Sequence, residues 1–505
     1  MAGTMMETSS PAPAADARHG IDPAWLVAGL LGLFALDNLL LLRFLGLTPA
    51  LVWIVGIGAT ALIAGMTARI RFDATIPVRR LLICMAVGLA MMLLGGQGRL
   101  FFANTDWLVR DAVLQDMVRW PWPFLYGGHG DPQLMRAPLG MYLAPALFGK
   151  IGGVTVAEWA MLVQNGLIGG ALLALGSLLF DTTRGRTIAL VVFVLFSGLD
   201  TIGELLTDPS TLWPLDHHID DWAGLQYSST VTLAFWVPHH ALAGWLGSLL
   251  FLLWRSGKAP LFPLLASVPL GMLWSPLAEI GMLPFVALAG VETLAGLRLK
   301  RVDIAIPAVA CLLAAAPIRY MQVDPAKLGL YFETLPTAIY CLFEMLEVIP
   351  FVAIIWLAQR GGRFGPATFA LATMSLLLLP FAHIGAGVDL EMRASIPALL
   401  ILAVLSADIL AGVRCGAAIC LAGMLMVGAM TPLREVIRAV INRPAPQTSC
   451  DLWSGTDIAF PQNGKENYFA DATRVPGWML PAIPPVLVSP IDDGRCWPRA
   501  WQVRR

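Results

Sequence analysis

The first residues that could support chemistry are three carboxylates, Asp106, Asp111 and Asp116, in a polar segment between two apolar runs. Polar residues at positions 104 and 105 can cap a helix, which we expect to end near residue 119 before a proline. A spacing of five turns a helix by about 500°, so neighbouring carboxylates point about 140° apart and do not form one cluster. Asp106 lies nearest the membrane, where it could act as a base on a lipid-borne substrate. It could equally stabilise the helix start and pair with Arg110.

A second polar segment contains the candidate metal ligands Asp216, His217 and His218, followed by Asp220 and Asp221. Nitrogen and oxygen ligands this close together could hold a divalent metal. The spacing matches no fixed zinc motif, and a solvated loop would have the same composition. A divalent metal is therefore the one cofactor that the sequence suggests, with the solvated loop as the alternative.

Two further sets of polar residues lie beside apolar runs. His239 and His240 begin one run, at a depth where ionisable groups are costly and often functional, although histidines also pack there. Asp389, Glu391 and Arg393 precede another run. Arg393 could bind a phosphate, or it could simply pair with Asp389 one turn away.

Composition limits the classes of protein that these residues can belong to. Of the 505 residues, 57% are hydrophobic and only 13% are charged, whereas soluble domains have about 25% charged residues. This excludes a soluble enzyme, a nucleic-acid-binding protein and a disordered chain. The sequence also lacks a phosphate-binding GxxxxGK[ST] loop, a GxGxxG turn, a GxSxG elbow and an HExxH zinc motif.

The expected fold is an all-α polytopic membrane protein with about 13 transmembrane helices, because a bilayer core needs roughly 20 apolar residues per helix. The short run at 138–151 is expected to be a re-entrant or interfacial helix. The expected spans are 24–43, 48–68, 81–98, 157–180, 187–200, 230–253, 259–275, 277–297, 302–317, 337–358, 365–384, 394–413 and 415–431.

Basic residues indicate the orientation, because short cytoplasmic loops carry an excess of Lys and Arg. Every second short loop is basic, which predicts a cytoplasmic N-terminus in a bacterial inner membrane. The outer loops would then be 99–137, 201–229, 318–336 and 385–393. The basic markers are Arg69, Arg71, Arg79, Arg80, Arg184, Arg186, Arg255, Lys258, Arg298, Lys300, Arg301, Arg360, Arg363 and Arg414.

The sequence divides into a disordered cytoplasmic tail (1–22), a transmembrane domain (23–431) and a small irregular periplasmic region (432–505). Cys450 and Cys496 are the two cysteines of the last region. In an oxidising periplasm they would form a disulfide, although two unrelated thiols remain the alternative.

With this organisation, residues 80–431 resemble the GT-C superfamily of membrane glycosyltransferases, whose members carry an acidic residue early in the first large outer loop. Asn104-Thr-Asp-Trp107 occupies that place here. Segments similar to Arg136-Ala-Pro-Leu-Gly-Met-Tyr-Leu-Ala-Pro145 and Asp389-Leu-Glu-Met-Arg-Ala-Ser-Ile-Pro397 also occur in bacterial proteins of this type.

The resemblance implies transfer of a sugar from a polyprenyl-phosphate carrier to an acceptor at the periplasmic face. Asp106 would be the base, and an inverting reaction would fit a single base. Arg393 would hold the phosphate with help from Arg136 or His239. His240 and Asp389 complete the expected substrate-binding set, and membrane lipid is the expected partner.

Two other functions remain open. A polymerase or ligase of lipid-linked polysaccharides would depend on outer-loop arginines such as Arg393 rather than on Asp106. A lipid or polysaccharide transporter would make no bond and would use intramembrane charges such as Glu344 and Glu347, which share a helix face.

Overall fold

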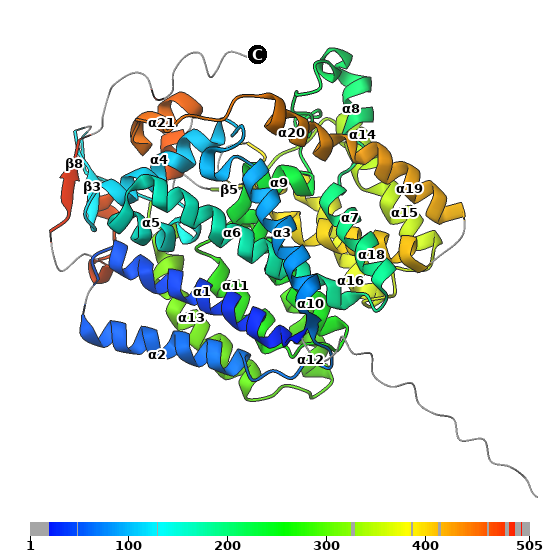
Figure 1. Ribbon diagram of the computed structural model, residues 1–505, viewed down its shortest axis with the longest axis horizontal. Coiled ribbons are helices and arrows are strands. Elements are labelled where there is room, and N and C mark those ends of the chain that lie inside the picture. The colour runs from blue at the N-terminus through cyan, green and yellow to red at the C-terminus, as the bar shows by residue number, and fades with distance from the viewer. Residues whose placement is uncertain are drawn as a thin grey trace, which may run out of the picture.

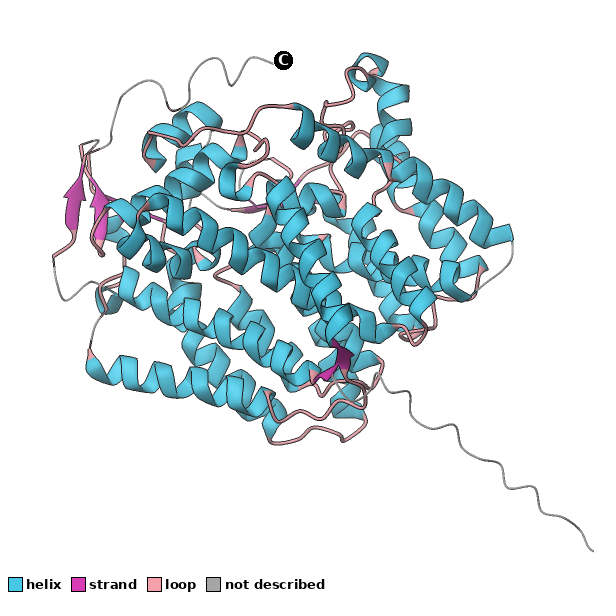
Figure 2. Cartoon of the chain, viewed as in Figure 1, coloured by secondary structure: helices cyan, strands magenta, loops and turns pink. Residues whose placement is uncertain are grey.

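The computed structural model describes residues 20–505 except residues 48, 129, 325–328, 385–386, 413–415, 462–463, 480–483, 490–495 and 497–505. Residues 1–19 of the expected N-terminal tail, the basic marker Arg414 and parts of the expected C-terminal region lie outside the described residues. The described chain is mostly helical, with a few short strands (Figure 2).

Seven helical segments of the described chain are long and apolar enough to cross a membrane, and a bent pair could make an eighth. Four are single helices: α1 (Pro23–Phe44), α2 (Ala50–Thr67), α12 (Pro276–Ala295) and α13 (Val302–Met321). Three join α6 (Val154–Gly176) to η3 (Ser177–Leu179), α7 (Thr183–Leu195) to α8 (Asp200–Thr207), and α19 (Gly416–Gly428) to α20 (Met430–Ile441). In the bent pair, α14 (Thr337–Glu347) meets α15 (Ile349–Leu357) at 44°. The chain thus has the helices of a multi-pass membrane protein.

The thirteen apolar runs expected from the sequence do not all form long helices. Pro238 separates α9 (Thr230–Trp236) from α10 (Pro238–Arg255), because proline has no backbone N–H for a helical hydrogen bond. α5 (Gly140–Gly152), in the run at 138–151, has 13 residues and is too short to cross the bilayer core. Other short helices are α3 (Val78–Leu94), α11 (Phe262–Gly271), α16 (Pro366–Leu378) with η6 (Leu379–Phe381), and α18 (Ile396–Gly412).

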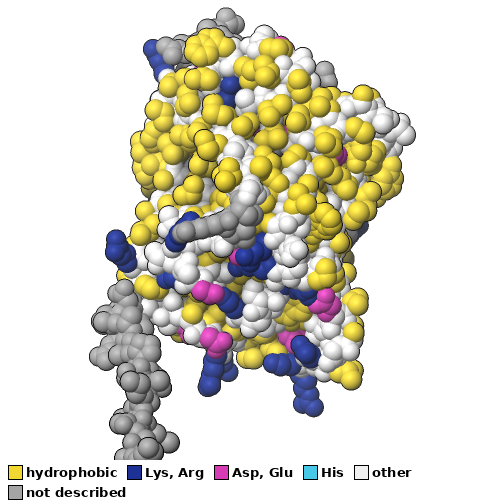
Figure 3. Space-filling model, turned by 90° about the vertical axis from the view of Figure 1, so that its right-hand side faces the viewer, with side chains coloured by type: hydrophobic (Ala, Val, Ile, Leu, Met, Phe, Trp, Pro, Cys, Tyr) yellow, Lys and Arg dark blue, Asp and Glu magenta, His cyan; other side chains and the backbone are white. Residues whose placement is uncertain are grey.

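Hydrophobic side chains cover much of the outside of the helices. Of the residues of α2, only Gly56, Ile63 and Thr67 are buried. Leu51 is 70% exposed, and other helices also have large apolar side chains that are more than half exposed. An apolar surface of this extent favours contact with lipid. Figure 3 shows the face on the right-hand side of Figure 1, where charged side chains of both signs gather below a largely hydrophobic surface.

The two ends of the molecule carry different elements. At one end, α4 (Asp106–Arg119) lies beside α21 (Leu452–Ala459) (Figure 1). At the other end, β1 (Gly20–Ile21) pairs with β2 (Ile76–Pro77), which leads into α3. We call these the α4 end and the β1 end. The predicted helix in the first outer loop is confirmed, but α21 covers it, and residues 107–117 are buried rather than open on a surface.

The C-terminal region folds onto the polar segment at 99–137. β3 (Phe124–Tyr126) and β4 (Gln133–Met135) form an antiparallel pair. β7 (Phe469–Asp471) joins β4 antiparallel and β8 (Val486–Val488) joins β3 parallel, which gives the strand order β7-β4-β3-β8. The remaining elements are η2 (Gln97–Arg99), η4 (Pro209–Leu212), β5 (Leu330–Phe332) paired with β6 (Ala382–Ile384), α17 (Asp389–Ala394), α22 (Gly464–Tyr468), η7 (Ala472–Arg474) and η8 (Gly477–Met479).

α10 lies in the core, with all of residues 238–253 buried. α3 packs closely on α6 through small residues, because a Cβ at Gly88 would lie 2.4 Å from the backbone nitrogen of Gly170. Glycines of this kind let two helix backbones approach in a membrane. Trp107 Nε1 of α4 donates to the backbone oxygen of Phe235 at 2.8 Å, which holds the start of α4 near the start of α10.

Candidate functional site

Asp106 and Arg110 form an ion pair on the first turns of α4, with 2.8 Å between Asp106 Oδ2 and Arg110 Nη2. Arg110 Nε also donates to the backbone oxygen of Trp236, just before α10. Burial alone would lower the pKa of Arg110, but the charge of Asp106, together with Tyr142 and Tyr468, raises it. The guanidinium is therefore a buried permanent cation beside a carboxylate.

His239 and His240 lie in the first turn of α10, both buried, with their ring centroids 4.0 Å apart. His240 Nδ1 lies 2.7 Å from Ser275 Oγ, which fixes the orientation of this ring. His239 packs near the ring of Tyr142, with centroids 6.5 Å apart. Its Nδ1 is buried and has no hydrogen-bond partner among the described residues.

Arg393 and Asp389 form an ion pair one turn apart on α17. The Arg393 side chain is 12% exposed, and its Nε has no acceptor within the described part of the chain. Arg110 pairs with Asp106, and the charges of Arg110 and Arg393 both act on the ring of His239. The three residues predicted from the sequence, Asp106, His239 and Arg393, therefore lie in one group around Arg110.

Tyr468, at the end of α22, completes this group. Burial raises the pKa of Tyr468 to about 12, and the charges of Arg110, Asp106, Arg393 and Asp389 also act on its hydroxyl. We call the following residues the outer polar cluster: Asp106, Arg110, Tyr142, His239, His240, Asp389, Arg393 and Tyr468. The sequence singled out five of them as site residues and Arg110 as a possible partner of Asp106. Tyr142 had no predicted role, and no sequence signal pointed to Tyr468.

Arg136 does not have the phosphate-binding position expected from the sequence. It is fully buried, and its Nη1 donates to the backbone oxygens of Val323 (2.7 Å) and Asp324 (3.1 Å). Its Nη2 donates to the backbone oxygen of Glu466. Since these donors already have acceptors, Arg136 joins the C-terminal region to the core instead of binding a ligand.

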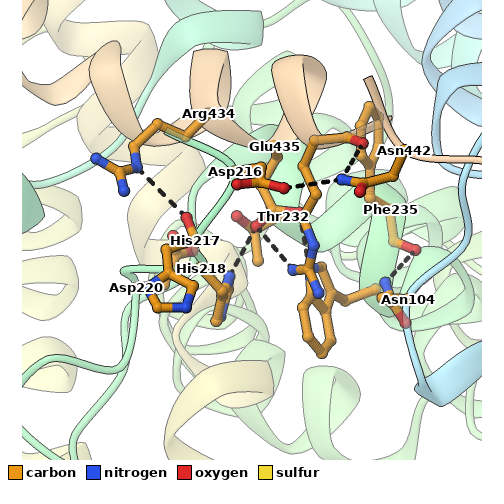
Figure 4. Close-up of polar contacts among 12 residues, drawn as sticks. Asn104, Asp216, His217, His218, Asp220, Thr232, Phe235, Arg434, Glu435 and Asn442 are labelled. Carbon is orange, nitrogen blue, oxygen red and sulfur yellow. Dashed lines mark hydrogen bonds and ion pairs between the residues drawn. The ribbon is translucent and has the colours of Figure 1, made fainter. Parts of the chain in front are cut away.

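Two of the expected metal ligands, His218 and Asp216, have other partners (Figure 4). His218 Nδ1 lies 2.8 Å from Glu435 Oε1, and Asn442 donates to Asp216 Oδ2 at 3.1 Å. Burial would lower the pKa of His218, but the hydrogen bond and charge of Glu435 raise it to about 9. A protonated imidazole has no lone pair for a metal.

Consistent with this, no group of three or more His, Cys, Asp or Glu side chains in the described chain is arranged to hold a metal ion. Asp216, His217 and His218 are therefore not arranged as a metal site within the described residues. The segment at 216–218 instead contacts α20, where Arg434 also donates to the backbone oxygen of His217 at 3.3 Å.

The other two carboxylates of α4 have structural partners. Asp111 and Glu158 both pair with Arg99, at 3.1 and 2.6 Å. Asp116 Oδ2 accepts hydrogen bonds from the hydroxyl of Tyr126 (2.6 Å) and the backbone N–H of Leu452 (2.8 Å). The three aspartates therefore face different partners, as their spacing predicts.

A disulfide joins Cys450 to Cys496, with their Cα atoms 4.8 Å apart. Cys450 lies two residues before Leu452, the first residue of α21, so the disulfide and Asp116 hold the same segment. The disulfide joins two parts of the C-terminal region, and the hydrogen bond from Leu452 to Asp116 holds this region against α4, from which Asp106 reaches the outer polar cluster.

Buried carboxylates also occur away from this cluster. Asp200 Oδ2 accepts from Ser197 (2.6 Å) and Thr431 (2.8 Å), and Glu347 accepts from Trp222 Nε1 at 3.3 Å. Glu344, one turn from Glu347, is 3% exposed. The shared face expected for Glu344 and Glu347 is buried against protein.

No protein-family model matches the chain, no curated protein is significantly similar to it, and no solved structure matches its fold.

Proposed function

We propose that this protein is a membrane glycosyltransferase of the GT-C type, which moves a sugar from a polyprenyl-phosphate carrier to an acceptor hydroxyl at the α4 end. The observation that carries the proposal is the convergence of Asp106, His239 and Arg393, from three separate elements, around Arg110 and Tyr468. Such a transfer needs a base near the acceptor and cations for the phosphate leaving group, and Asp106, Arg110 and Arg393 are groups of these kinds.

In the proposed reaction, the acceptor oxygen bonds to the anomeric carbon while the bond from that carbon to the phosphate oxygen breaks. The polyprenyl phosphate leaves with the bonding electron pair, and Asp106 takes the hydroxyl proton. Arg393 Nε and the Arg110 guanidinium stabilise the negative charge on the phosphate, because arginine binds phosphate oxygens with several donors. His239 Nδ1 would bind the sugar or the acceptor.

The proposed orientation places the β1 end in the cytoplasm and the α4 end in the periplasm of a bacterial inner membrane, with about thirteen membrane crossings. Exposed basic residues at the β1 end, Arg69, Arg71 and Arg79, favour this orientation. The disulfide between Cys450 and Cys496 favours an oxidising compartment for the C-terminal region.

The test is sugar transfer by the full chain in nanodiscs, with a radiolabelled polyprenyl-phosphate sugar as donor and membrane extract as acceptor. Asp106→Asn should lower the rate by roughly 10²- to 10⁴-fold, the usual contribution of a general base. Asp131→Asn is a matched control, because Asp131 is exposed and lies in the same loop. Full activity of Asp106→Asn would remove Asp106 from the mechanism.

The buried carboxylates Asp200, Glu344 and Glu347 favour a second candidate, transport of a lipid-linked saccharide without bond chemistry. In proteoliposomes, a transporter would move a fluorescent lipid-linked sugar across the bilayer unchanged, and Glu347→Gln would slow it. If the label is instead transferred covalently to an acceptor, and Glu347→Gln does not slow this transfer, the protein is not a transporter of this kind.

A further inference from the structure

A cavity of about 660 Å³ opens at the β1 end, far from the outer polar cluster. Its walls come from α3, α6, α7, α10 and α18, and most of its lining is apolar. Lining residues extend from Pro77 to Met92 along α3, which corresponds to about 22 Å of helix. One leaflet of the bilayer core is about 15 Å thick, so the cavity is long enough for an acyl chain.

The mouth of this cavity is strongly basic. Arg79, Arg80 and Arg186 all line it, and Arg80 and Arg186 lie close enough to repel each other. Within the described chain, none of these three arginines has a carboxylate within 4.0 Å. Three positive charges therefore face one opening without an ion-pair partner in the described structure.

Four other basic residues near this end pair with carboxylates of the described chain. Arg255 pairs with Glu292, and Lys258 lies 3.5 Å from Asp181. Arg360 and Arg363 share Asp408, at 3.3 and 3.0 Å. These four cations have carboxylates of the described chain beside them, whereas Arg79, Arg80 and Arg186 do not. Arg69 and Arg71 also have no such partner, but they are exposed to solvent, whereas the three arginines of the cavity meet at one opening, which favours a negative charge from outside the protein.

The positions of these arginines in their helices also favour a bound anion. Arg79 and Arg80 lie in the first turn of α3, and Arg186 lies near the start of α7. A helix N-terminus carries partial positive charge, so arginines there are unfavourable unless an anion compensates them. Ile83, 48% exposed at the edge of the cavity, continues the apolar outer surface, so a lipid chain can enter from the bilayer.

We propose that this cavity binds an anionic phospholipid, with the phosphate at Arg80 and Arg186, Arg79 beside them, and an acyl chain between α3 and α7. The site is independent of the proposed transferase activity. It would hold lipid of the leaflet at the β1 end, whereas the outer polar cluster lies at the opposite end of the molecule.

The probe is phosphatidylglycerol bound to the full chain, measured by native mass spectrometry and by competition with a spin-labelled phosphatidylglycerol. Removal of both charges in Arg80→Gln/Arg186→Gln should weaken binding by roughly 30-fold, since each basic residue near an anionic surface contributes about fivefold. Arg80→Lys/Arg186→Lys should restore most of it. Leu173→Trp, which fills the apolar part of the cavity, should displace the lipid while it leaves the arginines intact.

Arg69→Gln/Arg71→Gln is the matched control, because these exposed arginines lie outside the cavity at the same end. Each variant is compared for its elution volume and melting temperature, so that a folding defect is recognised. The proposal is overturned if phosphatidylcholine binds as well as phosphatidylglycerol, if the double variant retains the lipid, or if polyprenyl phosphate binds in preference. Inorganic phosphate alone should not compete, because it lacks the acyl chain.

Discussion

Arg136 and Glu466 lie 330 residues apart in the sequence, and the guanidinium of Arg136 donates a hydrogen bond to the backbone oxygen of Glu466. The backbone N–H of Arg136 also donates to the carbonyl oxygen of Tyr468 at 2.7 Å. The C-terminal region is therefore part of the structure around the outer polar cluster rather than an independent appendage.

Arg136→Gln should destabilise this attachment by about 3 kcal/mol, because it leaves buried carbonyl oxygens without donors. Thermal unfolding and limited proteolysis of the purified protein would measure the effect, with early cleavage in the C-terminal region as the expected result. Arg319→Gln is the control, since the hydrogen bond of the Arg319 side chain to the carbonyl of Gln322 is exposed. Equal proteolysis of both variants would contradict the role given to Arg136.

Loss of the disulfide should also loosen the C-terminal region. Cys450 and Cys496 are separated by 46 residues, and closing a loop of this size contributes about 4 kcal/mol in the chain-entropy model. Cys450→Ser/Cys496→Ser should therefore lower the melting temperature, whereas Cys311→Ser, at an exposed free cysteine, should not. An intact-mass change on reduction of the wild-type chain would show that the bond forms.

Asp116 should make stability depend on pH. Burial raises its pKa to about 7, against the opposing hydrogen bonds from Tyr126 and Leu452. Because the folded protein holds this proton more tightly than the unfolded chain, the stabilisation is present below about pH 4 and is lost as the pH rises to about 7.

The loss amounts to about 4 kcal/mol at most for a shift of this size. Asp116→Asn should remove this component, so that its melting temperature changes less between pH 5 and pH 8 than that of the wild type. Asp131→Asn, at an exposed position, should retain the wild-type dependence. Identical pH profiles for Asp116→Asn and the wild type would show that Asp116 ionises normally.

If the proposed function is correct, substitution of Arg393 should lower kcat/KM for the lipid-linked donor more than kcat/KM for the acceptor. Arg393→Ala should reduce kcat/KM for the donor by roughly 10²- to 10³-fold, comparable to the loss of one preorganised donor to a developing anion. Arg393→Lys should recover part of it, because lysine supplies the charge without the fork of donors. Collapse of activity in Arg393→Ala with full activity in Asp106→Asn would instead indicate a polymerase or ligase.

The proposed orientation predicts opposite labelling at two exposed positions. In a background without free cysteines, Ser210→Cys near η4 should react with a membrane-impermeant maleimide in cells whose outer membrane alone is permeable. Arg298→Cys, between α12 and α13, should react only after the inner membrane is opened. The reverse pattern would invert the orientation of the whole chain.

The sequence by itself determined the class of protein and the segments where polar chemistry is concentrated, because hydropathy and helix-start signals are local properties. It located the helix that begins at Asp106, and it singled out His239 and Arg393 before their neighbours were known. It overestimated the number of long helices, since prolines such as Pro238 divide continuous apolar runs into shorter pieces.

Only the tertiary structure decided which polar residues meet. His218 and Arg136, both candidate ligand-binding residues in the sequence, are satisfied by Glu435 and by backbone oxygens instead. Tyr468 reaches the outer polar cluster because β7 pairs with β4 across more than 300 residues of chain. Such pairings depend on how buried polar groups satisfy one another in three dimensions, which spacing along a single chain does not encode.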